Sequence, residues 1–169
     1  MRIELVTGTS GAWQPRCATT RSRPRSWRSP FPPRLAVMDA FKEELALISP
    51  LAWDPIDSPK DLGERSVIAF AAGCSYRRIL ESWLNQEGVA PGKVMEFASY
   101  HAIVACVAAG SGVAIVPRSV LAVLGAEHTV RIGALSGSHG RALTQLVWRA
   151  DDDTPALQAL RHKLDSPQG

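Results

Sequence analysis

Between residues 66 and 135 the sequence alternates short apolar runs with amphipathic segments, and this alternation constrains the fold most strongly. Residues 66–71 (SVIAFA) form an apolar run that ends in a Gly-Cys-Ser turn. Residues 76–84 then carry apolar side chains three and four positions apart, which is typical of an amphipathic helix, and Gly88 follows. Strands that alternate with helices predict an α/β fold with a mainly parallel sheet covered by helices.

The remaining elements follow the same logic. We expect strands at residues 93–98, 112–116, 129–135 and 142–150, and helices at 99–110, 117–124 and from Thr154 onward. Upstream, residues 35–41 and 44–49 are two short strand candidates. Prolines at 50, 55 and 59 interrupt any regular element after them. This proline-marked stretch predicts a crossover between two lobes.

Residues 14–34 (QPRCATTRSRPRSWRSPFPPR) differ in composition from everything around them. They contain six Arg, five Pro and no acidic residue, and they show no helical or strand period. Of the 19 Lys and Arg in the chain, 13 lie elsewhere and face 16 acidic residues, so the rest of the chain has a net charge of −3. The pI of about 9.0 therefore reflects this segment, and the remainder is a poor partner for a phosphate backbone.

Three interpretations of residues 14–34 remain open. The segment is a disordered basic linker, a nucleic-acid-binding arm, or coding sequence translated out of frame. The flanking residues 1–12 (MRIELVTGTSGA) and 35–50 (LAVMDAFKEELALISP) look like neighbouring pieces of one fold. Because a single fold is interrupted between these two flanks, the out-of-frame interpretation is favoured.

Composition also excludes several classes of protein. Cys17, Cys74 and Cys106 are widely spaced, no CxxC pair exists, and the four His do not cluster with them. We therefore expect no zinc site, no disulfide framework and no cofactor. The sequence contains no run of about 18 apolar residues, so we expect no membrane span. The N-terminal residues lack the pattern of a signal peptide. The expected compartment is the cytoplasm.

Candidate binding residues lie at two predicted helix starts. Open α/β sheets bind ligands beyond the carboxyl ends of their strands, which here places Gly73-Cys74-Ser75 and Ser99-Tyr100 at such positions. Each helix start offers backbone N–H groups, a positive dipole end and a hydroxyl, which suits a small anion. In the alternative interpretation Ser75 and Ser99 only cap their helices.

No catalytic set can be assembled, so we expect no enzyme activity. Cys74 at a helix N-terminus could have a lowered pKa, but a phosphatase-like cysteine needs Arg six residues later, where this chain has Leu80. A small buried turn residue is the favoured role of Cys74. The acidic run 151–153 is expected to solvate a loop and favour the start of the last helix rather than bind metal. Arg77 or Arg78 either points toward the ligand or is solvated.

Two passages resemble the second lobe of LysR-type effector domains. One is residues 70–77 (FAAGCSYR) with 80–84 (LESWL), Gly88 and Pro91. The other, and the more specific, is residues 99–117 (SYHAIVACVAAGSGVAIVP), which combine a helix, Gly-x-Gly, a strand and Pro. Residues 43–50 (EELALISP), 146–149 (LVWR) and the helix after Thr154-Pro155 resemble the two crossovers of that family. The resemblance covers about residues 35–165, plus 1–12.

The resemblance implies a two-lobed effector domain similar to type 2 periplasmic binding proteins, with an incomplete first lobe. Residues 1–50 would form part of lobe I, residues 60–140 lobe II, and residues 141–169 the return strand and the C-terminal helix of lobe I. The family's first strand, its first helix and its winged helix-turn-helix have no counterpart in this sequence. The ligand cleft would be lined by Thr7, Thr9, Ser10, Gly73, Cys74, Ser75, Ser99 and Tyr100.

The resemblance therefore predicts the ligand-sensing domain of a transcriptional regulator. Its partners would be a small, anionic effector, a second copy of the chain, and DNA only through a helix-turn-helix domain that this chain lacks. The alternatives are a stand-alone small-solute-binding protein, for which a signal peptide is expected, and a non-functional fragment of a regulator. A small α/β enzyme is the remaining alternative, and it lacks a catalytic constellation.

Overall fold

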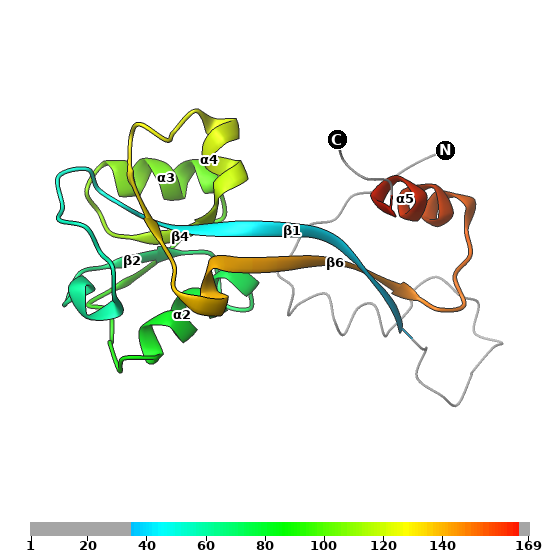
Figure 1. The fold of residues 1–169 in the computed structure, drawn as a ribbon, viewed down its shortest axis with the longest axis horizontal. Helices are drawn as coiled ribbons and strands as arrows, with labels where there is room; N and C mark the ends of the chain where they lie inside the picture. Colours follow the sequence, from blue (N-terminus) through cyan, green and yellow to red (C-terminus); the bar gives the residue numbers. More distant parts are fainter. Residues whose placement is uncertain (1–34, 166–169) are drawn as a thin grey trace. The chain divides into compact units, whose positions relative to one another are not determined.

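The computed structural model describes residues 35–165, and the chain divides into two compact units. One unit is Glu43–Ala142, and the other combines Met1–Lys42 with Leu143–Gly169. Figure 1 shows the helices and strands of both. Residues 1–34, and with them the predicted cleft residues Thr7, Thr9 and Ser10, lie outside the described part.

The unit Glu43–Ala142 contains the predicted alternation of strands and helices. In chain order these are β2 (Val67–Ala69), α2 (Ser75–Asn85), β3 (Val94–Glu96), α3 (Tyr100–Ala108), β4 (Ala114–Pro117) and α4 (Arg118–Leu124). β2 and β3 pair in parallel, and Val67 also forms a parallel bridge with Val113 just before β4. The predicted α/β arrangement is confirmed for these elements.

Strand β1 (Leu35–Ser49) joins the two expected strands at 35–41 and 44–49 into one strand of 15 residues. It pairs antiparallel with β4 and with β5 (Arg131–Ala134). Its side chains alternate between exposed and half-buried at the start and are continuously buried from Leu45 to Ser49. This change of burial pattern explains why the sequence alone suggested two strands separated by the polar residues 42–43.

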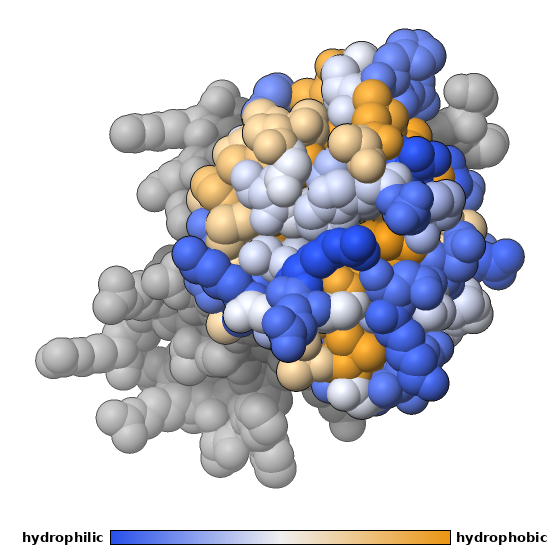
Figure 2. All heavy atoms as spheres, turned by 90° about the vertical axis from the view of Figure 1, so that its left-hand side faces the viewer, coloured by the Kyte–Doolittle hydropathy of each residue, from blue (hydrophilic) through white to orange (hydrophobic). Residues whose placement is uncertain are grey.

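Two apolar clusters form the core of this unit, one on each face of the sheet. Helix α2 covers one face, and α3 and α4 cover the other (Figure 1). The β1 side chains alternate between them, since Leu45 and Leu47 belong to the α2 cluster and Ile48 to the α3 and α4 cluster. Trp83 of α2 is the largest fully buried side chain, at 1% exposure. The surface of this unit at the left end of Figure 1 is mainly hydrophilic, with separate apolar patches (Figure 2).

The other unit contains the first half of β1, most of strand β6 (Arg141–Arg149), which pairs with β1, and helix α5 (Pro155–Asp165). Asp39 on β1 accepts a hydrogen bond from Gln145 on β6 at 2.9 Å. α5 starts at Pro155, as predicted, but none of its described residues is buried, and Leu160 of its predicted apolar face is 45% exposed.

The 3-10 helices at Pro59–Leu62 and Gly137–Gly140 complete the described elements. The second of these lies between the strands expected at 129–135 and 142–150. Within residues 35–165, no helix is both long enough and apolar enough to cross a membrane.

Gly112 is required by a close approach of two backbones. A Cβ atom at this position would lie 2.5 Å from the carbonyl oxygen of Ser66. That carbonyl accepts a hydrogen bond from the Val113 N–H at 3.1 Å, so the two segments cannot separate without breaking the pairing beside β2. Gly110 has a different role, because it ends α3 with a φ of 88°.

We expect Gly112→Ala to lower the free energy of unfolding by about 1–3 kcal/mol, because the new methyl group overpacks a backbone contact. Gly133→Ala is the matched control, since its Cβ would approach no atom closer than 3.5 Å. Urea unfolding of both variants and the wild type measures the difference. Equal midpoints for the two variants would contradict the close approach at Gly112.

Candidate functional site

The starts of α2 and α3 lie at the same edge of the sheet. β2 ends at Ala69 and β3 at Glu96, and these two residues are partners in the parallel register. The chain then enters α2 through Cys74 and α3 through Ser99, which are the N-cap residues with extended backbone. Gly73 precedes the first of these with a φ of 92°, a conformation that favours glycine.

The structure therefore brings five of the predicted cleft residues to one edge. These residues are Gly73, Cys74, Ser75, Ser99 and Tyr100. The side chains of Cys74 and Ser99 make no capping hydrogen bond. The capping interpretation thus has no support for Ser99, while Ser75 is the first residue of α2 rather than its N-cap. The participation of these residues in effector binding stays a prediction.

A group of two tyrosines and one carboxylate, the tyrosine–carboxylate cluster, lies at this edge. Its members are Glu43 on β1, Tyr76 on α2 and Tyr100 on α3. The Tyr76 hydroxyl donates to Oε2 of Glu43. The ring of Tyr100 packs beside the ring of Tyr76. The cluster joins three elements that are distant in the sequence.

Tyr100 is the most perturbed titratable group of this edge. Its ring packs edge-on against Phe70, with centroids 4.8 Å apart, and its centroid lies 6.3 Å from that of Tyr76. Burial raises the pKa of Tyr100 far above its ordinary value, and Tyr76, Glu43 and Cys74 raise it further. Its hydroxyl is therefore neutral at physiological pH and able to donate.

A groove of about 510 Å³ opens beside the start of α3, between α3 and α4. Its walls are mainly apolar, with hydroxyl and imidazole groups from Ser99, His101 and Ser119. The lining residues are Phe70, Ala98, Ser99, Tyr100, His101, Ser119, Val120, Val123 and Leu124. This volume lies within the range of small-molecule sites. A second groove, of about 410 Å³, lies between α2 and the strands β2 and β3, and none of the five described cleft residues is among its lining residues.

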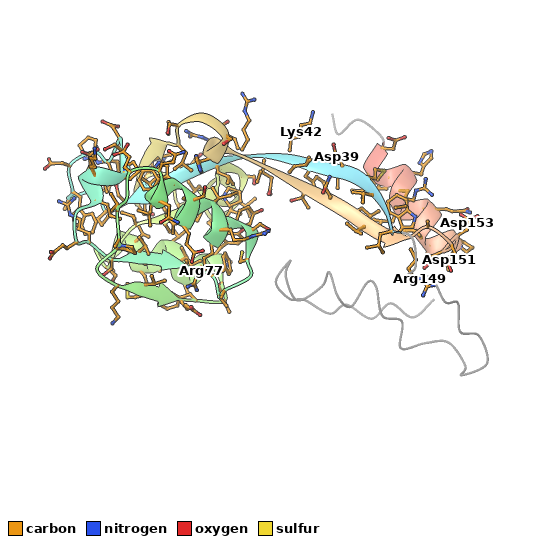
Figure 3. All side chains as sticks on the ribbon, turned by 90° about the horizontal axis from the view of Figure 1, so that it is seen from below. Asp39, Lys42, Arg77, Arg149, Asp151 and Asp153 are labelled. Carbon is orange, nitrogen blue, oxygen red and sulfur yellow. The ribbon has the colours of Figure 1, made fainter. Side chains whose placement is uncertain are left out.

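Arg77, labelled in Figure 3, is engaged by protein groups rather than by solvent. Its guanidinium pairs with Glu81 at 2.8 Å and with Glu96, and it donates to the Phe70 carbonyl at 3.3 Å. The hydrogen bond with Glu81, followed by that with Glu96, raises the pKa of Arg77. Of the two arginines for which ligand contact and solvation were the open alternatives, Arg77 thus ties α2 to β3, and Arg78 is exposed.

The acidic run at residues 151–153 makes contacts around the start of α5. Asp151 pairs with Arg149 (Figure 3), and Asp152 accepts the Thr154 N–H just before α5. The acidic run therefore organises a helix start, as predicted. Among residues 35–165, no group of three or more His, Cys, Asp or Glu is placed to hold a metal ion, and the described cysteines, Cys74 and Cys106, are free thiols.

Sequence reasoning missed Glu43 and Tyr76 as members of this edge. They are 33 residues apart and meet only because β1 passes beside the start of α2. The one local signal for Glu43 is its position in the strand alternation. Glu43 lies on the same strand face as Leu45 and Leu47, and these two residues pack in the α2 cluster.

Tyr100 should make the stability of the protein depend on pH in the alkaline range. Its pKa in the folded state lies above the unfolded value of about 10. Its contribution is therefore complete below about pH 10 and is lost as the pH rises further. We expect the free energy of unfolding of the wild type to fall more steeply above pH 10 than that of Tyr100→Phe, as measured by urea unfolding. Parallel pH profiles would contradict this assignment.

The LysR substrate binding domain family matches residues 25–166. The HTH-type transcriptional regulator SoxR of Arthrobacter sp. (strain TE1826) is 37% identical over 127 residues, which are 75% of this chain and 43% of that protein. The HTH-type transcriptional regulator GltR of Bacillus subtilis (strain 168) is 36% identical over 135 residues, with coverages of 79% and 46%. The chain thus spans less than half the length of these bacterial relatives.

A solved structure shows the same fold. The effector binding domain of QuiR in complex with shikimate matches with a TM-score of 0.65 and 18% identity, over 92% of this chain and 76% of that one. The expected type 2 periplasmic-binding-protein-like architecture is thereby confirmed, with incomplete sheets in this chain. The family comprises ligand-binding domains of transcriptional regulators and is not a family of enzymes. This chain belongs to the LysR substrate-binding domain family.

Proposed function

We propose that this chain senses a small anionic effector at the edge where α2 and α3 begin. The observation that carries the proposal is the position of Ser99. It lies at the N-terminus of α3, its side chain makes no capping bond, and it lines the 510 Å³ groove. A ligand in that groove reaches a hydroxyl and the unpaired N–H groups of a helix start together.

The backbone supplies the positive potential of this site. The first N–H groups of a helix have no partner within it, and the helix dipole places partial positive charge there. Two helix starts, those of α2 and α3, lie at adjacent strand ends and act on the same region. The QuiR effector domain was solved with shikimate, which is a carboxylate, and this supports a carboxylate as the recognised group.

In the intact regulator, the effector would act by shifting the relative positions of lobes or subunits. The proposal assigns Thr7, Thr9 and Ser10 of lobe I to the same effector site. DNA would be contacted through a helix-turn-helix domain outside this chain, and a homodimer would transmit the change. These partners are part of the proposal and follow from family membership.

Ser99→Ala should weaken binding of a small carboxylate effector about tenfold, because it removes a hydrogen bond to a charged group worth roughly 1.5 kcal/mol. A screen of small carboxylates by thermal shift identifies a ligand, and calorimetry then measures its affinity for each variant. Ser111→Ala is the matched control, since Ser111 is an exposed serine beyond the other end of α3. Unchanged affinity in both Ser99→Ala and Ser75→Ala would refute this site.

A further inference from the structure

The groove beside Ser99 is also lined by α4, and α4 is apolar on more of its surface than the core requires. Leu121 is 1% exposed and packs in the apolar cluster under α3 and α4. Val120 and Val123 line the groove and belong to neither apolar cluster. A helix that covers a core with one face usually carries polar side chains on its other faces. The two valines therefore form an apolar surface that packing of the core does not explain.

Val123 departs most clearly from the usual pattern of a helix surface. It is 86% exposed, the largest exposure of any large apolar side chain within residues 35–165. A single exposed apolar side chain is common on proteins. Val123, however, follows Ser119 by four positions and Val120 by three, so the three lie on one side of α4, and all three line the groove. The exposed valine thus extends an apolar wall of the groove.

Aromatic side chains form another part of this wall. Phe70, just after β2, and Tyr100, the first residue of α3, pack edge-on with ring centroids 4.8 Å apart, and both line the groove. No Asp, Glu, Lys or Arg is among the described residues that line it. A second charge on a ligand would have no ionic partner in the groove, and burial of such a charge is unfavourable. The lining therefore suits an uncharged, apolar group.

The groove combines this apolar wall with the proposed anion site. Ser99 and the start of α3 offer a hydroxyl and backbone N–H groups to a carboxylate. The volume of about 510 Å³ is larger than a cavity of about 150 Å³, which is enough for a benzene molecule. A ligand bound by its carboxylate at Ser99 thus has room for an apolar body of ring size or of several methylene groups.

We propose that α4 determines which carboxylates the effector site selects, and that Val120 and Val123 favour a ligand with an apolar body. This inference rests on the proposed function, because it assumes that the carboxylate binds at the start of α3. Binding then has two separable contributions. Ser99 and the backbone N–H groups bind the charged end of the ligand, and α4 contacts its apolar end.

The test uses acetate, butyrate and hexanoate, which carry the same single charge and differ only in the number of methylene groups. Dissociation constants are measured by NMR titration of the full chain at neutral pH and constant ionic strength. Each methylene group that leaves water strengthens binding by up to about fourfold. We expect the affinity to rise along the series, so that hexanoate binds the wild type at least tenfold more tightly than acetate.

Val123→Ser should weaken the binding of hexanoate at least threefold and leave that of acetate unchanged, because acetate has only one methyl group to contact the wall. Val94→Ser is the matched control, since Val94 is 41% exposed on β3 and does not line this groove. Its affinity for hexanoate should equal that of the wild type. Ser99→Ala, in contrast, should weaken all three acids by a similar factor.

These variants distinguish the inference from the proposed function. If all three acids bind the wild type equally, or if Val123→Ser and Val94→Ser affect hexanoate alike, the inference about α4 is wrong, while weaker binding in Ser99→Ala still supports the proposed site. If the affinity rises along the series but neither Ser99→Ala nor Ser75→Ala weakens any acid, the carboxylate binds elsewhere, and the proposed function and the inference are both wrong. Failure of all three acids to bind the wild type contradicts both as well.

Discussion

The burial of β1 on both faces between Leu45 and Ile48 organises the unit Glu43–Ala142. These four residues are 0–2% exposed; all of them pair with β4, and the last three also pair with β5. Because side chains alternate along a strand, this short stretch contributes to the apolar cluster under α2 and to the cluster under α3 and α4. A shift of one residue in its register would exchange the two sets and expose polar side chains to both cores.

The same alternation fixes the electrostatics of the candidate site. Two positions before Leu45, Glu43 faces the α2 side and meets Tyr76. Glu44 faces the other side and pairs with Arg118 at the start of α4. Two adjacent glutamates thus have different partners and different roles, although the sequence shows them only as a polar pair in a strand.

The tyrosine–carboxylate cluster lies at the edge that this register produces. Tyr76 of α2 donates to Glu43 of β1, and the ring of Tyr100 of α3 packs beside the ring of Tyr76, with centroids 6.3 Å apart. Elements that are distant in the sequence, β1, α2 and α3, therefore meet beside the groove.

The elements of this unit could be predicted from the sequence because they depend on local patterns. The spacing of Ile79, Leu80 and Trp83 defines α2, and Ser99 and Gly110 mark the ends of α3. The continuity of β1 could not be predicted, because residues 42–43 are polar and the pairing that extends them is distant in sequence. The pairing of Arg77 with Glu96 could not be predicted either, since Glu96 is 19 residues away and approaches only when β3 pairs with β2.

The pairing of Arg77 also bears on the proposed anion site. This guanidinium fixes α2 against β3 and the Phe70 carbonyl, so Arg77 is held away from ligand recognition at the helix starts. Positive potential there comes from backbone N–H groups, which do not titrate, and the neighbouring Tyr100 stays protonated across the physiological range.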